Sequence, residues 1–220
     1  PNGSKVCDVG SDHAYLPVYL IQNKKITSAI AGEVVEGPFL SAKQTVRDYL
    51  MEDHIEVRFG DGLQILSKED EVTAVTICGM GGELISRILE AGYSGSHLNG
   101  RERLILQPNV AEHYVREWLM NHSYQIVEET VVSDNHRLYE IIVAEPSNEQ
   151  VEYTELELKY GPILLKEPSE LSVAKWKRTN RKNKEILEQL QKSKTPQHEK
   201  IEQFEKAFNE LQGVIDRANS

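Results

Sequence analysis

Short apolar segments alternate with longer amphipathic ones over roughly the first 145 residues of the chain. The expected strands are residues 5–9, 28–33, 55–59, 72–78 and 103–107, and the expected helices are 14–24, 37–51, 82–91 and 111–121. Strands that alternate with helices of this length indicate βαβ units and a mostly parallel sheet. The first part of the chain is therefore predicted to be an α/β domain.

The alternation ends in two strand-like segments with no helix between them. Residues 124–132 and 137–144 are joined only by residues 133–136. A connection this short predicts a β-hairpin, because parallel strands need a much longer crossover. The last strand is therefore expected to run antiparallel to its neighbour.

The composition changes after Pro146. Residues 159–162 and 166–168 are expected to be linkers, and the helical pattern begins at about Pro168. The segment 193–196 divides this region into two amphipathic helices. We therefore expect two domains, residues 1–148 and 149–220.

The last helix carries a narrow apolar stripe with the 3-4-3-4 spacing of a coiled coil. The stripe consists of Ile201, Phe204, Phe208, Leu211 and Ile215. The preceding helix offers four apolar partners, Trp176, Ile186, Leu187 and Leu190. A short break between two such helices predicts an antiparallel helical hairpin.

Composition restricts the class of protein. The chain has 220 residues, 39% hydrophobic and 27% charged, and no apolar run near the roughly 20 residues that span a bilayer. No signal peptide opens it, and its two cysteines, Cys7 and Cys78, lie in apolar segments, so we expect a reduced, cytoplasmic protein. The chain begins at Pro1 instead of Met, which indicates a preceding N-terminal piece. A monomer is the expected oligomeric state.

The net charge of −10 is unevenly distributed. Residues 1–150 hold 12 basic and 23 acidic side chains, whereas residues 151–220 hold 13 and 12. One stretch contains six cations and no acid, namely Lys175, Lys177, Arg178, Arg181, Lys182 and Lys184. This stretch predicts a surface that attracts a polyanion such as RNA, although a solvated helix face is the alternative interpretation.

The turn after the first strand is a candidate for cofactor binding. It contains Asp8, Gly10 and Asp12, at the carboxyl end of a strand where doubly wound sheets bind nucleotide-like ligands. It is not a dinucleotide fingerprint, because Asp12 and Tyr15 stand where two glycines are required. Acidic residues would repel a pyrophosphate but suit S-adenosylmethionine, which carries a sulfonium and an ammonium group. An ordinary strand-to-helix turn is the alternative.

Two further acids follow the second and third strands. Glu33 ends its strand 23 residues after Gly10 and can accept hydrogen bonds from both ribose hydroxyls. The segment Gly60-Asp61-Gly62 offers an acceptor for an adenine amino group. Each signal alone is weak, because a surface Glu and a turn are common features.

Glycines are concentrated after the fourth strand. Three of the four residues Gly79, Met80, Gly81 and Gly82 are glycine, which is typical of a backbone that approaches a ligand or flat ring. Met80 could shape a slot for a base. Gln107, Pro108 and Asn109 end the next strand, and their amides are expected to face the same crevice and orient the edge of the base. Cys78 is predicted to be a buried thiol.

Other chemistries find no support in the sequence. The sequence contains no P-loop and no pattern typical of a Ser-His-Asp catalytic triad. The seven histidines show no metal-ligand spacing, so no metal is expected. No catalytic base can be assigned.

The segments CDVGSDHAYLP, GEVVEGP, FGDG, ICGMGGELI, LILQPN and RLYEII, in this order, resemble the bacterial tRNA adenine-22 N1-methyltransferase family. The resemblance covers most of residues 5–145. It implies a class I methyltransferase sheet that ends in an antiparallel hairpin, followed by a C-terminal helical coiled-coil domain. It also implies S-adenosyl-L-methionine as cofactor, tRNA as partner, and methyl transfer to N1 of adenine 22.

The resemblance also implies positions for the site. Gly10, Asp12 and His13 would form the first cofactor loop. Glu33 would bind the ribose, and Asp61 and Gly62 would bind the adenine of the cofactor. Residues 79–82 would form the floor of the active site. The complete set expected at the cofactor is Asp8, Gly10, Asp12, His13, Glu33, Gly60, Asp61, Gly62, Cys78 and Gly79. The set expected at the reacting base is Gly79, Met80, Gly81, Gln107, Pro108 and Asn109.

Two alternatives stay open on the sequence. One is a class I methyltransferase that acts on another RNA, a small molecule or a protein, and the methyl acceptor distinguishes it. The other is an RNA-binding scaffold with a decayed cofactor site, against which Glu33 and Asp61 argue. A nicotinamide oxidoreductase is excluded by the glycine spacing and the acidic loop.

Overall fold

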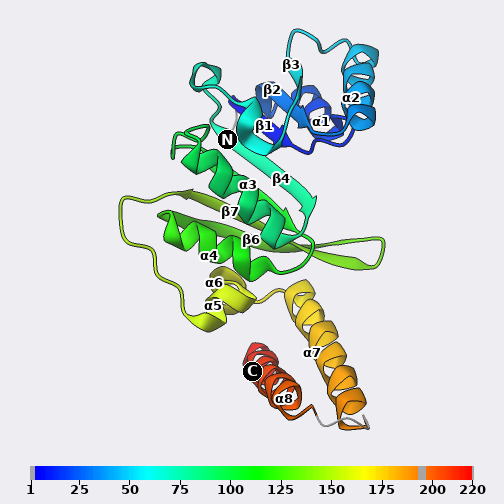
Figure 1. The fold of residues 1–220 in the computed structure, drawn as a ribbon, viewed down its shortest axis with the longest axis vertical. Helices are drawn as coiled ribbons and strands as arrows, with labels where there is room; N and C mark the ends of the chain where they lie inside the picture. Colours follow the sequence, from blue (N-terminus) through cyan, green and yellow to red (C-terminus); the bar gives the residue numbers. More distant parts are fainter. Residues whose placement is uncertain (1–2, 193–196, 220) are drawn as a thin grey trace.

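The computed structural model describes residues 3–192 and 197–219, and seven strands in them form one sheet in the order β3-β2-β1-β4-β5-β7-β6 (Figure 1). The strands are β1 (Ser4–Val9), β2 (Ile26–Glu33), β3 (Ile55–Phe59), β4 (Ala74–Met80), β5 (Arg103–Pro108), β6 (Tyr124–Asp134) and β7 (Arg137–Pro146). The first five strands pair in parallel, and β7 pairs antiparallel with both β5 and β6. The predicted parallel sheet with a terminal hairpin is confirmed.

Helices cover both faces of the sheet. The helices α1 (Tyr15–Gln22) and α2 (Glu36–Asp48) pack on one face, and α3 (Gly82–Ser94) and α4 (Glu112–Asn121) pack on the other. Neighbouring residues of β1 show the division, because Val6 lies in the core under α1 whereas Cys7 lies in the core under α3. This alternation is the period-two pattern of a strand buried on both faces.

The hairpin between β6 and β7 turns more tightly than the sequence suggested. The turn consists of Asn135 and His136 alone, both with positive φ (45° and 62°), and the strands include Ser133 and Asp134. Two positive φ angles are the signature of a type I′ turn, whose twist matches that of paired strands. The hairpin extends beyond the rest of the sheet (Figure 1).

The linker expected at residues 159–162 was a wrong interpretation, because two short helices, α5 (Glu155–Tyr160) and α6 (Pro162–Lys166), lie there and pack against α4 and β6. The linker expected at residues 166–168 is largely confirmed, because the chain between Lys166 and Glu170 is neither helix nor strand. Thr154 caps α5 through a capping box with Glu157. Gly161 (φ +90°) then reverses the chain, so the Gly-Pro pair joins two helices instead of marking a flexible tether.

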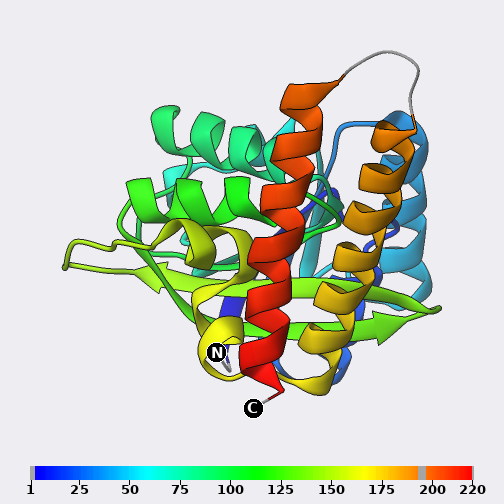
Figure 2. The same cartoon turned by 90° about the horizontal axis from the view of Figure 1, so that it is seen from below.

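The helices α7 (Glu170–Gln191) and α8 (His198–Ala218) lie side by side beyond the β-hairpin (Figure 2). They run antiparallel, because Lys177 contacts Asn219 whereas Asn180 contacts Gln212, earlier in α8. Trp176 packs in their shared core and is 3% exposed. Ile186, expected to pack there as well, is 36% exposed. Coiled-coil packing stays a prediction, and the expected break at residues 193–196 lies outside the described residues.

Candidate active site

The loops after β1 to β5 meet at one edge of the sheet, because parallel strands present their carboxyl ends together. We call this the carboxyl edge. Its residues belong to loops 10–14, 34–35, 60–61, 81 and 109–111 together with the last residues of each strand. The order of the strands in the sheet places the loops after β1 and β4 next to each other in the middle of the edge. This is the position where the strand order reverses and where open α/β sheets bind ligands.

Asp8 lies beneath the first loop and is 4% exposed. Its two carboxylate oxygens accept hydrogen bonds from the hydroxyls of Ser11 (2.6 Å) and Thr76 (2.5 Å). Burial raises the pKa of Asp8 above its ordinary value, and these two hydrogen bonds oppose that shift. Asp8 therefore anchors the loop to β4, and its oxygens are engaged from within the protein.

The first loop has a strained backbone. Three consecutive residues, Asp12, His13 and Ala14, have positive φ angles of 38°, 70° and 57°, which is uncommon outside glycine. The start of the loop is held in place, because the backbone N–H groups of Gly10 and Ser11 donate to the carbonyl of Gly32 (3.0 and 3.1 Å). Strain of this kind persists only where surrounding contacts determine it, and it concentrates at functional sites.

Glu33 stands at the end of β2 beside this loop and is 7% exposed. Its Oε1 accepts a 2.6 Å hydrogen bond from the N–H of Asp12, and within the described residues its Oε2 has no donor. Burial raises the pKa of Glu33, and the N–H of Asp12 lowers it in part. One carboxylate oxygen thus positions the loop, while the other is available to a ligand.

The residues after β3 lie next to this acid. The N–H of Gly60 donates to the carbonyl of Glu33 (2.9 Å), and Asp61 is exposed at the start of the 3₁₀ turn η1 (Gly62–Ile65). Gly62 has φ +54° and faces Ile88 of α3. Asp61, Gly62 and Ile88 line a depression of about 220 Å³ between η1 and α3. The expected adenine-binding acid is therefore placed beside an apolar wall.

The backbone N–H and carbonyl of Gly79 are held by two side-chain amides, one at the end of β5 and one directly after it. Gln107 accepts the N–H of Gly79 through Oε1 (2.8 Å), and Asn109 donates Nδ2–H to the carbonyl of Gly79 (2.7 Å). The two amides are also joined to each other (3.0 Å). Gly79 has φ +77° with open space around the position of a Cβ, so its backbone conformation is what requires glycine. These amides therefore hold the floor, and their contact with the base stays a prediction.

A second lock joins the same two loops further along. The N–H of Asn109 donates to the carbonyl of Met80 (2.7 Å), and the N–H of Gly82 donates to the carbonyl of Val110 (2.8 Å). A Cβ on Gly82 would collide with the carbonyl oxygen of Ala111. Pro108, at the end of β5, is buried, and Met80 contacts Gly10 of the first loop. Loops after β1, β4 and β5 therefore form one connected surface.

Cys78 precedes this floor and is partly buried. Burial raises its pKa to about 12, so the thiol is protonated near neutral pH. Cys78 and Gln107 also line a groove of about 790 Å³ along α1. Cys7 is fully buried, and burial raises its pKa as well. Both cysteines are free.

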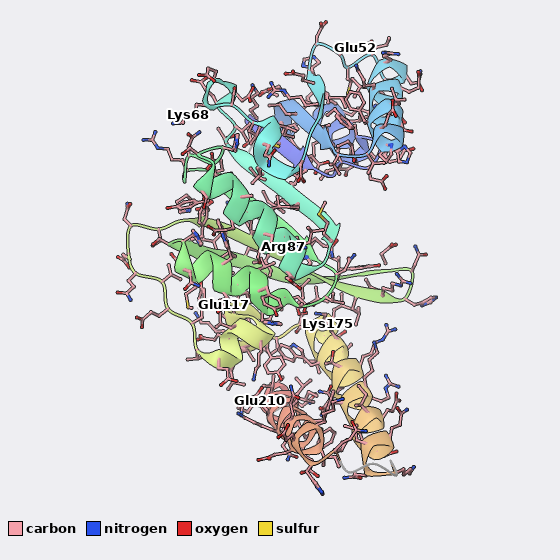
Figure 3. All side chains as sticks on the ribbon, in the orientation of Figure 1. Glu52, Lys68, Arg87, Glu117, Lys175 and Glu210 are labelled. Atoms are coloured by element: carbon pink, nitrogen blue, oxygen red, sulfur yellow. The ribbon has the colours of Figure 1, made fainter. Side chains whose placement is uncertain are left out.

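A buried charge network joins the sheet to the C-terminal helices. It consists of Glu112, Arg116, Glu129, Glu140 and Lys175. Arg116 is fully buried, and its Nε and Nη2 donate to Glu129 (2.8 Å) and Glu140 (2.5 Å). Lys175, at the end of α7 nearest the sheet (Figure 3), contacts Glu112 (2.5 Å) and Glu140 (2.6 Å).

The charges in this network support one another. Burial alone would lower the pKa of Arg116, but Glu140 and Glu129 raise it above its ordinary value. Burial would likewise raise the pKa of Glu140, and Arg116 and Lys175 hold it below its ordinary value instead. The network also binds the helices before α7, because Arg116 donates to the carbonyl of Leu158 and Glu129 accepts the N–H of Ile163.

Lys175 is thereby separated from the other five cations predicted to contact RNA. Its ammonium group is engaged by two carboxylates inside the network. The other five, Lys177, Arg178, Arg181, Lys182 and Lys184, are exposed on α7. Of these, Lys177 contacts Asn219 (3.5 Å), and Arg178 donates to the carbonyl of His136 in the hairpin turn (3.0 Å).

Sequence reasoning missed Thr76 and the buried charge network. Thr76 interrupts an apolar strand opposite Asp8, and such a lone polar residue next to a buried acid was the available signal. Arg116 and Glu129 belong to amphipathic segments where a charged residue is ordinarily assigned to solvent. Their pairing joins elements distant in the sequence, so no local pattern reveals it.

The donors and acceptors at the carboxyl edge fit S-adenosylmethionine. The five loops contain acids but no Lys or Arg, which suits a cationic ligand without phosphates. No cluster of three or more His, Cys, Asp or Glu within residues 3–192 and 197–219 is arranged to hold a metal ion. Across the same residues, every helix is too short or too polar to span a membrane.

Comparison with known proteins gives consistent matches over nearly the whole chain. A family model described as tRNA (adenine(22)-N(1))-methyltransferase matches residues 6–213. A Bacillus subtilis (strain 168) protein with the same description is 42% identical over 222 residues, which cover 98% of this chain and 92% of the relative.

Solved structures agree with this match. The B. subtilis m1A22 tRNA methyltransferase TrmK has a TM-score of 0.88 and 40% identity, with 98% of this chain and 93% of that chain covered. The M. capricolum TrmK in complex with S-adenosyl-homocysteine, the natural cofactor product, has a TM-score of 0.85 and 26% identity, with 98% and 92% covered. Both similarities extend over the sheet and the C-terminal helices.

Proposed function

The chain belongs to the tRNA (adenine(22)-N(1))-methyltransferase family, and from this premise we propose the roles of its residues in the reaction. The enzyme transfers a methyl group from S-adenosyl-L-methionine to N1 of adenine 22 in tRNA. The observation that supports these roles is the connected surface at the carboxyl edge, where the loops after β1, β4 and β5 touch one another beside Glu33.

We assign the cofactor to the loops after β1, β2 and β3. Glu33 accepts the ribose hydroxyls through its available Oε2, and Asp61 accepts the adenine amino group. Gly10 and the strained residues Asp12 and His13 border the methionine part, because their backbone is held against β2. Asp8 acts from below, by holding this loop in place through Ser11 and Thr76. When bound, the cofactor supplies a methyl group already activated on a sulfonium.

We assign the target adenine to the slot bordered by Met80, Gly79 and Asn109. N1 of neutral adenine carries a free lone pair, so the protein has to position the base and exclude water without removing a proton first. The carbonyls of the glycine-rich floor and the side-chain oxygens of Gln107 and Asn109 already accept hydrogen bonds within the protein, and their second lone pairs can stabilise the positive charge that develops on the base. Tyr15, which is exposed and stacked on His13, offers a surface for the base.

The chain divides into a cofactor-binding domain, residues 1–148, and a C-terminal helical domain, residues 149–220. In support, the sheet ends at Pro146 and the C-terminal helices have a core of their own around Trp176 and Leu211. The free cysteines suit the reducing cytoplasm in which we place the enzyme.

Methyl transfer to unmodified tRNA tests the assignment. The protein is incubated with isotopically labelled S-adenosylmethionine and tRNA transcripts, and the labelled nucleosides are identified by mass spectrometry. We expect labelled 1-methyladenosine at position 22, and none when adenine 22 is replaced by guanine. Label at another position or in another nucleoside would contradict the proposed reaction.

Asp61→Asn is expected to lower cofactor affinity. Asp53→Asn, at an exposed position before β3, is the matched control.

A further inference from the structure

A cleft of about 540 Å³ opens between the loop after β5, the strand β7 and the helix α7. Asn109 lines this cleft and is the same residue that donates a hydrogen bond to the carbonyl of Gly79 in the active site. The cleft therefore continues directly from the slot that we assign to the adenine.

Three cations line this cleft, Arg137 from β7 and Arg178 and Lys182 from α7. Within the parts of the chain that the structure describes, none of the three is within 4.0 Å of a carboxylate. The fourth cation, Lys175, and the acid Glu112 also line the cleft but neutralise each other. The cleft therefore has an excess of positive charge on a protein whose net charge is −10.

We propose that this basic cleft, defined by Arg137, Arg178 and Lys182, binds the phosphates of the nucleotides that flank the target adenine. The inference rests on the proposed function, because the flanking nucleotides matter only if the base enters the adjacent slot. A base held outside its stack needs its backbone fixed on either side, and guanidinium groups bind phosphate through paired hydrogen bonds. Tyr139, half-buried in the cleft, adds an aromatic face on which a neighbouring base can stack.

The geometry divides the cations of α7 into two groups. Arg178 and Lys182 are four residues apart and share the helix face that borders the cleft, whereas Arg181 and Lys184 do not line it. The predicted RNA-binding stretch is thus expected to act through one face only, together with Arg137, which lies outside that stretch. This division supplies a matched pair of variants with equal changes in charge.

The test compares Arg137→Glu/Lys182→Glu with Arg181→Glu/Lys184→Glu by measuring the Kd for tRNA at several salt concentrations. For the cleft variant we expect about tenfold weaker binding and a slope of log K against log salt reduced by about 2, because each lost phosphate contact lowers the slope by about 1. We expect the control variant to bind like the wild type. Equal weakening in both variants, or an unchanged slope in the cleft variant, would overturn the proposal.

Three further measurements separate the possible failures. Calorimetric titration with S-adenosylmethionine is expected to give the same Kd in both variants, and phosphate-ethylation interference on wild-type complexes is expected to mark phosphates next to adenine 22. If the charge reversal lowers Tm, the milder variant Arg137→Gln/Lys182→Gln is measured in its place. The same decrease in the slope of log K against log salt is expected. A wild type that does not methylate adenine 22 would refute the proposed function, whereas normal methylation and tRNA binding by the cleft variant would refute the cleft alone.

Discussion

At the carboxyl edge the functional groups are held mainly by backbone, whereas at the junction with the C-terminal helices the structure is held by charged side chains. The first loop and the glycine-rich floor depend on positive φ angles and on hydrogen bonds to peptide groups. The junction depends on Arg116 and Lys175, which connect β6, β7, α4 and α7 through three carboxylates.

The difference shows how each region fails when it is altered. A substitution that adds a single methyl group can disturb a loop held by its backbone, while the rest of the fold stays intact. A buried charge network gives little net stability when complete, yet loss of one member leaves an uncompensated charge in the interior. Substitutions at the carboxyl edge should therefore change the reaction, and substitutions at the junction should change the fold.

The largest effect is expected at the junction, from Arg116→Met. This change leaves Glu129 and Glu140 buried without their common partner, and it should lower the free energy of unfolding by about 3–5 kcal/mol. Urea denaturation followed by circular dichroism measures the change. Arg47→Met, at an exposed position of α2, is the control and should have little effect. Similar stability of the two variants would show that the network is dispensable.

The next effect is expected at the carboxyl edge, from Glu33→Gln. Loss of the charged acceptor should weaken cofactor binding by about 1.5–3 kcal/mol, or roughly tenfold to a hundredfold, with the fold retained. Calorimetric titration with S-adenosylmethionine measures it. Glu36→Gln, three residues later in the first turn of α2, removes the same charge from an exposed position and should bind normally. Equal Kd values for both variants would remove Glu33 from the cofactor site.

A smaller effect is expected from Gly79→Ala, which tests whether the floor needs the backbone conformation of Gly79. Alanine meets no neighbouring atom there, so only its φ of +77° is unfavourable, at a cost of about 1–2 kcal/mol. Gly37→Ala, in the first turn of α2, is the matched control, because the φ of Gly37 is not positive and no atom lies within 4 Å of a Cβ at this position. We expect kcat to fall about tenfold in the first variant only, as the floor shifts. Equal kcat values would show that the floor tolerates another conformation.

The smallest effect is expected from an ion pair outside both regions. Arg58 binds both carboxylate oxygens of Asp70 (2.6 and 2.7 Å), and this hydrogen bonding lowers the pKa of Asp70 to about 2. A lowered pKa stabilises the fold above the unfolded-state value of about 3.9, and the contribution disappears as the pH falls towards 2. Because solvent reaches Arg58, the contribution should be about 1 kcal/mol.

Urea denaturation of the wild type and Asp70→Asn between pH 6 and pH 2.5 tests this expectation. The difference between the two proteins should be constant above about pH 5 and should shrink below pH 4. A difference that does not depend on pH would assign the effect to the capping hydrogen bonds that Asp70 makes with Ser67.

Sequence patterns predicted the sheet and much of the carboxyl edge, because both depend on local features. Each expected strand and helix of the sheet domain was found within a few residues of its expected position; Glu33 ends β2 as expected, whereas β4 runs on through Gly79 to Met80. Sheet topology then brings the loops together without further information. Short motifs at strand ends are therefore a reliable guide to this edge.

The junction could not be predicted in the same way. Residues 159–162 have the composition of a linker, yet they form a helix end and a reversal because α4 and β6 offer them a surface. Lys175 belongs to a basic stretch, yet Glu112 and Glu140 withdraw it from the surface. Both outcomes depend on partners more than 30 residues away, so tertiary packing decided them.

The double lock between the loops after β4 and β5 has a consequence for redesign of the enzyme. Hydrogen bonds at Gly79, Met80 and Gly82 fasten this segment to the segment that contains Gln107, Asn109 and Val110. Neither segment can therefore move alone to admit a larger or differently shaped nucleobase. Directed evolution towards a new substrate should therefore draw on libraries that vary both loops together. In libraries confined to one loop, we expect every active variant to keep the wild-type selectivity.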